Sequence, residues 1–142
     1  MLARMIYVSE AAVGTSIEEV EAILKVARRN NHANDLSGML LFDRQSFLQC
    51  LEGDAEKLTR LLGSLAKDAR HQRMKLLHFG AASERHFCDW TMGFAGESAN
   101  NRQIYLRHTA SSHFLPHDLC ADNALALLLG MARQVSSASA KD

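Results

Sequence analysis

Residues 36–52, LSGMLLFDRQSFLQCLE, contain two apolar runs separated by a short polar stretch. The runs at 36–42 and 46–52 have the length and the apolar content of strands, and Asp43-Arg44-Gln45 supplies a turn between them. Within the second run, Gln49 places an amide among apolar neighbours, and a buried amide costs free energy unless its donors and acceptor find partners. This stretch therefore predicts two connected strands and a polar group that needs a partner.

The regions around this stretch continue a regular pattern of strands and helices. Strands are predicted at residues 2–9, 74–79 and 90–94. A first helix begins after Ser16, which has capping-box spacing to Glu19, and ends near residue 30, with Arg28 among the cations that suit its carboxyl end. A second helix follows Asp54 as N-cap and runs to about residue 69.

The resulting order, βαββαββ, predicts an α+β fold, a ferredoxin-like sandwich. Right-handed crossovers place both helices on one face of a single sheet. In this topology we expect the first and third strands to be central, parallel neighbours.

The C-terminal part has a different character. Residues 101–106 are predicted as a short helix, and residues 123–135 as a strongly apolar helix that covers the bare sheet face or contacts a partner. Residues 136–142 are expected to fray. We therefore divide the chain into a sheet domain, 1–96, and a helical extension, 97–142.

Composition excludes several classes of function. The 142 residues are 47% hydrophobic and 23% charged, which is typical of one globular domain. Sixteen basic residues balance sixteen acidic ones, so direct nucleic-acid binding is not expected. No apolar run is long enough for a membrane span, and the N-terminus lacks a signal-peptide pattern, so we expect a cytoplasmic protein. The three cysteines are widely spaced, and no metal site is expected.

Several polar side chains fall where core packing has little use for them. Tyr7 lies in the first strand, Gln49 in the third, and Asn30 and Asn31 at the end of the first helix. Amides carry both donors and acceptors, which match the mixed O4, N5 and N3 edge of a flavin ring. Apolar residues that could enclose the faces of such a ring are Ile23, Leu40, Phe47 and Leu65.

Five motifs, in order along the chain, resemble those of one known family. They are RMIYVS (4–9), RNNHANDLSG (29–38), FLQCLEG (47–53), DARH (68–71) and RHFCDWTM (85–92). Over roughly residues 2–95 the chain resembles the BLUF domains, blue-light sensors that use flavin. Its C-terminal part resembles the two-helix extension of the short, stand-alone members.

The resemblance implies a role for each matching residue. Tyr7 resembles the electron donor to the excited flavin, and Gln49 the amide that rearranges after light. Trp90 and Met92, expected on one face of a strand, resemble the pair that reports this change to the surface. The implied cofactor is FAD, with FMN as the alternative, and the implied cofactor-binding residues are Ile23, Asn30, Asn31, Phe47, Gln49, Asp68, Arg70 and His71.

Plainer interpretations of these residues stay open. Tyr7 could be a packed aromatic residue, and Gln49 could bond a backbone carbonyl at a bulge. Arg70 and His71 could close the second helix, where cations are favourable. Trp90 and Met92 could be ordinary core residues.

We therefore expect a photoreceptor and not an enzyme. It would signal through an unknown downstream protein and form a homo-oligomer. Two enzymatic alternatives on the same scaffold are an acylphosphatase-like hydrolase and a flavin oxidoreductase. The first lacks a Gly-rich anion cradle after the first strand, and in the second Tyr7 and Gln49 would crowd the reactive flavin edge.

Overall fold

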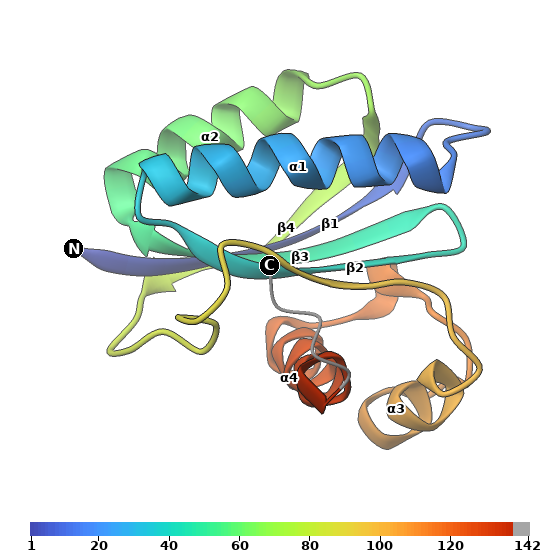
Figure 1. The fold of residues 1–142 in the computed structure, drawn as a ribbon. Coiled ribbons are helices and arrows are strands. Elements are labelled where there is room, and N and C mark those ends of the chain that lie inside the picture. Colours follow the sequence, from blue (N-terminus) through green and yellow to red (C-terminus); the bar gives the residue numbers. More distant parts are fainter. Residues whose placement is uncertain (138–142) are drawn as a thin grey trace.

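The computed structural model describes residues 1–137, which form one sheet with helices on both faces (Figure 1). The strands are β1 (Leu2–Ala11), β2 (Ser37–Asp43), β3 (Ser46–Asp54), β4 (His71–Ala81) and β5 (Gly93–Ala95). The helices are α1 (Ile17–Ala33), α2 (Ala55–Lys67), α3 (Asn101–His108) and α4 (Ala121–Ser137), with a 3-10 turn, η1, at Pro116–Asp118. The predicted ferredoxin-like α+β class is confirmed.

The five strands lie in the order β4-β1-β3-β2-β5. β1 and β3 are central neighbours as expected, but the prediction that they are parallel is wrong. They pair antiparallel, with Tyr7 directly opposite Gln49. The reason is the β2–β3 turn, where Arg44 and Gln45 take positive φ values of 50° and 64° and reverse the chain within two residues.

The two helix starts follow the predicted chemistry. Ser16 and Glu19 form the reciprocal capping box at α1. Asp54 caps α2 by accepting from the backbone N–H groups of Glu56 and Lys57. Both helices lie on one face of the sheet, as Figure 1 shows. The cleft described below lies between them and the sheet.

Alternation along the strands produces two separate cores. Tyr7 and its neighbours on one face pack with Val20 and Leu24 of α1 and Leu58 of α2. The other face packs against α4, and the central contacts there come from Ile6, Leu48, Cys50, Leu127, Leu128 and Met131. The expectation that the last helix covers the bare face is therefore confirmed (Figure 1).

The segment between β4 and β5, residues 82–92, is called the β4–β5 loop below. The strand predicted at 90–94 is shorter than expected, because pairing with β2 begins only at Gly93. Trp90 and Met92 are not on one strand face. Trp90 packs in the core on the α4 side, whereas Met92 packs in the core on the side of α1 and α2. Strand alternation fails here because the chain bends before β5 and the ring of Trp90 covers Gly93.

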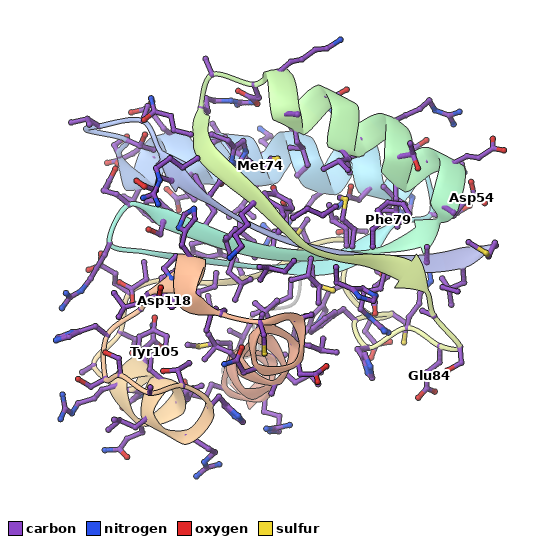
Figure 2. The ribbon with its side chains drawn as sticks, turned by 180° about the vertical axis from the view of Figure 1, so that it is seen from behind. Asp54, Met74, Phe79, Glu84, Tyr105 and Asp118 are labelled. Atoms are coloured by element: carbon purple, nitrogen blue, oxygen red, sulfur yellow. The ribbon has the colours of Figure 1, made fainter. Side chains whose placement is uncertain are left out.

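The C-terminal helices are longer than predicted. α3 extends to His108, and α4 includes residues 136 and 137, the first two residues of the stretch that was expected to fray. The remainder of that stretch, 138–142, lies outside the described residues. β4 forms one edge of the sheet and faces the viewer in Figure 2, with Met74 and Phe79 along it. The domain division at residue 96 stays a prediction.

Candidate functional site

A largely apolar cleft lies between α1, α2 and the sheet. Its walls combine residues from both helices with residues of the sheet, and Ile23, Leu40, Phe47 and Leu65, expected from the sequence, are all among them. Leu24, Ala27, Leu51 and Leu61 complete the apolar lining. The polar lining consists of Tyr7, Asn30, Asn31, Gln49 and His71, with the Met92 thioether beside them.

The Tyr7–Gln49 pair is the central polar contact of the cleft. The Tyr7 hydroxyl donates a hydrogen bond to Gln49 Oε1. Gln49 is 7% exposed, and its Nε2 lies 3.4 Å from Met92 Sδ. A thioether is a weak acceptor, so the amide donor is weakly satisfied within the protein. Burial, reinforced by the charge of Asp68, raises the pKa of Tyr7 well above its ordinary value and keeps the phenol protonated.

His71 also belongs to this cleft. It is the first residue of β4, and its ring lies 5.9 Å from the ring of Tyr7 and 5.0 Å from that of Phe47. Its Nδ1 lies 2.8 Å from Ser9 Oγ. Burial, and secondarily the charge of Arg70, lowers the pKa of His71 despite the opposing effect of Asp68.

Asn31 connects α1 to the end of the β4–β5 loop. Its side chain is buried, and its Nδ2 donates to the carbonyl of Thr91 at 2.7 Å. One turn earlier, Arg28 Nε donates to the carbonyl of Met92 at 3.0 Å. Sequence reasoning placed Arg28 only among the cations at the end of the helix. This contact had no signal in the sequence, because it depends on where a distant loop returns.

Asp68 and Arg70 lie at the turn between α2 and β4 and do not line the cleft. Arg70 donates to both carboxylate oxygens of Asp68, and this bond lowers the pKa of Asp68 to about 2. The structure pairs the two side chains with each other. Their predicted contacts with a ribityl chain and the O2 side of a flavin stay predictions.

The structure thus gathers most of the expected site residues around one cleft. Those at the cleft are Tyr7, Ile23, Asn30, Asn31, Phe47, Gln49, His71 and Met92. Trp90 lies on the opposite side of the sheet and stacks on Phe87 with ring centroids 6.4 Å apart. The fold and cleft define a sandwich domain suited to hold a flat, largely apolar ring with one polar edge.

Within residues 1–137, no group of three histidine, cysteine or acidic residues is placed to hold a metal ion. No helix of this part of the chain is long and apolar enough to cross a membrane.

Comparison with known proteins assigns the family. Residues 2–93 match the BLUF family, described as sensors of blue light using FAD, and the chain belongs to this family. It is 31% identical over 87 residues to the blue light- and temperature-regulated antirepressor BluF of Escherichia coli K12, which covers 61% of this chain and 22% of that protein. The chain therefore spans about a fifth of the length of that relative.

Solved structures show the same likeness over more of the chain. The photo-activated state of BlsA has a TM-score of 0.84 at 28% identity, covering 92% of this chain and 94% of BlsA. Its ground state has a TM-score of 0.82 at 30% identity, covering 91% and 88%. Klebsiella pneumoniae BlrP1, solved with FMN and cyclic diGMP, has a TM-score of 0.64 at 28% identity, covering 68% of this chain and 26% of BlrP1.

The cleft fits the flavin that this family binds, as FAD or FMN. A flat ring needs apolar walls on two faces, which α1, α2 and the sheet provide. Its polar edge needs donors and acceptors, and the Gln49 amide, held among the described residues by Tyr7 and a thioether, offers them. The chain is therefore a flavin-binding blue-light sensor of the BLUF family. Which side chains contact the flavin stays a prediction.

Proposed function

We propose that this chain converts blue light into a change of protein contacts through the Tyr7–Gln49–Met92 connection. The observation that carries the proposal is the hydrogen bond from Tyr7 to Gln49 Oε1, with Gln49 Nε2 against Met92 Sδ. These contacts run from the polar end of the cleft to the end of the β4–β5 loop. The flavin, when bound, supplies the absorption of blue light and accepts an electron from a nearby donor.

Tyr7 is the donor in this proposal. Its buried phenol stays protonated in the dark and holds the Gln49 amide in one orientation by donating to Oε1. Loss and return of an electron and a proton at the phenol would free Gln49 to reverse. A reversed amide turns Oε1 toward the Met92 thioether. Because a thioether has no hydrogen to donate, the contact with Met92 weakens.

The output is a change in association with other proteins. Gln49 contacts the Met92 sulfur, while Asn31 holds the carbonyl of Thr91 and Arg28 holds that of Met92. A reversed Gln49 therefore acts directly on the end of the loop. The relative named an antirepressor supports a protein partner, whose identity stays open, with a homo-oligomer as an additional expected assembly. Location in the cytoplasm, a preference for FAD and the absence of catalytic turnover and of direct nucleic-acid binding also stay predictions.

The test is the absorption spectrum of the flavin-loaded protein in darkness, under blue light and during recovery. We expect the spectrum to shift to the red while the flavin remains oxidised, and then to return. Tyr7→Phe and Gln49→Leu should retain flavin but lose the shift, because each removes a member of the hydrogen-bonded pair. Bleaching to reduced flavin in the wild type would instead indicate redox turnover and contradict the proposal.

A further inference from the structure

The sheet face opposite the cleft contains a fully buried carboxylate. Glu52 lies on β3, three residues after Gln49, and has no exposed surface. Because side chains alternate along a strand, Glu52 shares a face with Cys50, whereas Gln49 points into the cleft. Burying a charge costs free energy unless the charge is paired and hydrogen-bonded, so the partners of Glu52 explain how its burial is tolerated.

Within residues 1–137, the hydrogen bonds and the ion pair of this carboxylate lead to the β4–β5 loop or to Arg4. Glu52 Oε2 accepts from the backbone N–H of His86 at 2.8 Å, and Oε1 from that of Phe87 at 2.9 Å. Arg4, opposite Glu52 on β1, binds Oε2 through Nε and Nη2, each at 3.0 Å. Arg4 Nη2 also donates to the carbonyl of Glu84 at 2.8 Å. Figure 2 shows Glu84 below the end of β4, on the sheet face where α4 lies.

The far end of the same loop is held by a different set of groups. The carbonyl of Trp90 accepts from the backbone N–H of Gly38 at 3.2 Å, and those of Thr91 and Met92 accept from Asn31 and Arg28. Trp90 itself provides the first of these far-end attachments through its carbonyl, and among the described residues its buried indole Nε1 has no hydrogen-bond partner. The indole is therefore placed by the loop and by packing.

We propose that Glu52, whose charge is paired with that of Arg4, is the positioning residue that anchors the start of the β4–β5 loop. This anchoring makes the position of Trp90 depend on the orientation of the Gln49 amide. This inference rests on the proposed function and adds a residue that lies outside the cleft. With its start anchored, the loop cannot absorb a displacement of Met92 by shifting as a whole. The displacement then has to be taken up between Phe87 and Met92, where Trp90 lies.

Trp90 makes the inference measurable, because it is the single tryptophan of the chain. The experiment uses the full chain loaded with flavin and compares the wild type with Glu52→Gln, which keeps the size of the side chain but removes its charge. Three quantities are recorded: quenching of Trp90 fluorescence by acrylamide in the dark, the light-induced change of Trp90 emission, and the flavin red shift.

We expect Glu52→Gln to increase dark quenching several-fold and to reduce the light-induced change of Trp90 emission several-fold, while the flavin red shift remains. The matched control is Glu10→Gln, which removes a carboxylate of the same sheet that is paired with Arg73 at 2.6 Å. Neither member of that ion pair belongs to the β4–β5 loop. This control should behave as the wild type does. Quenching and emission changes in Glu52→Gln that equal those of the wild type would overturn the inference.

If Glu52→Gln does not fold or take up flavin, Arg4→Lys serves the same purpose, since it keeps the positive charge but gives up the two-nitrogen contact and the bond to Glu84. It should raise dark quenching to a smaller extent, and no rise would overturn the inference. The two proposals fail separately. A wild type without a red shift removes the photoreceptor mechanism, whereas a red shift without any response of Trp90 emission removes only the anchoring role.

Discussion

At the scale of single residues, the hydrogen bonds of Gln49 indicate that a ligand completes its surroundings. Its carbonyl oxygen accepts from Tyr7, but its NH2 group faces the Met92 sulfur. Buried polar groups in folded proteins are normally well satisfied, so a donor facing a weak acceptor beside an apolar cleft indicates a ligand edge. The same side chain therefore serves as a binding group and as the element that can change state.

His71 provides a prediction about pH at this scale. Its folded pKa lies below its ordinary value of 6.5, chiefly because of burial. The unfolded chain therefore binds more protons than the folded protein as the pH falls below about 6.5. The free energy of unfolding consequently decreases on acidification through and below that value. Urea unfolding should show a larger loss of stability from about pH 7.5 to about pH 5.5 in the wild type than in His71→Gln.

His113→Gln serves as the control, because His113 is exposed and is not among the residues that line the cleft. It should retain the pH dependence of the wild type. An equal pH dependence in His71→Gln would show that the environment of His71 does not favour the neutral ring.

At the scale of elements, the entry into β5 shows how a single glycine sets the path of the chain. A Cβ placed on Gly93 would lie 2.4 Å from Trp90 Cε3 and 2.7 Å from Met39 Sδ. Only glycine allows the indole to lie directly over the backbone at this point. The close approach places Trp90 on the α4 side while Met92, one residue before Gly93, faces the cleft.

Gly93→Ala should therefore destabilise the protein by about 1–3 kcal/mol, the usual cost of overpacking, and shift the emission of Trp90. Urea unfolding and fluorescence measure the two effects. Gly63→Ala is the matched control, since a Cβ there meets nothing within 4 Å and the position is inside α2, where alanine is favoured over glycine by about 0.5–1 kcal/mol. Equal stability of Gly93→Ala and the wild type would mean that the indole has another low-energy position.

At the scale of the whole molecule, the sheet is shared by two cores that lie back to back. The cleft depends on one core, whereas Ile6 and Leu48 on the other face are covered by Leu127, Leu128 and Met131. Because the same strands form both cores, α4 supports the floor of the cleft from the opposite face of the sheet, although none of the residues that line the cleft belongs to α4. The helical extension is therefore expected to be required for a stable sheet.

A chain ending at residue 96 should fail to unfold cooperatively, because it exposes the apolar face that α4 covers. Leu128→Ala, at a fully buried position, is a milder version and should cost about 2–5 kcal/mol. Leu106→Ala, at a side chain that is 46% exposed on α3, should change stability by less than about 0.5 kcal/mol. Urea unfolding and flavin uptake provide the readout. Normal behaviour of residues 1–96 would instead show that the division at residue 96 separates an autonomous domain.

Local patterns in the sequence were sufficient for the elements and for most of the cleft. The capping pairs at Ser16 and Asp54, the helical period of the apolar residues and the apolar runs of the strands depend on interactions between near neighbours. The meeting of Tyr7 and Gln49 also followed, because the topology makes their strands adjacent whatever their direction. The helices and strands are therefore encoded within short stretches of chain, whereas the meeting of Tyr7 and Gln49 follows from the order of these elements.

The tertiary structure alone decided what depends on contacts between distant segments. The direction of β3 relative to β1 and the separation of Trp90 from Met92 across the sheet were not predicted. Nor were the contacts of Arg28 and Glu52 with the β4–β5 loop. Such contacts depend on where the chain returns after many residues. The local spacing of residue types does not specify where the chain returns, because one sequence pattern is compatible with many loop conformations.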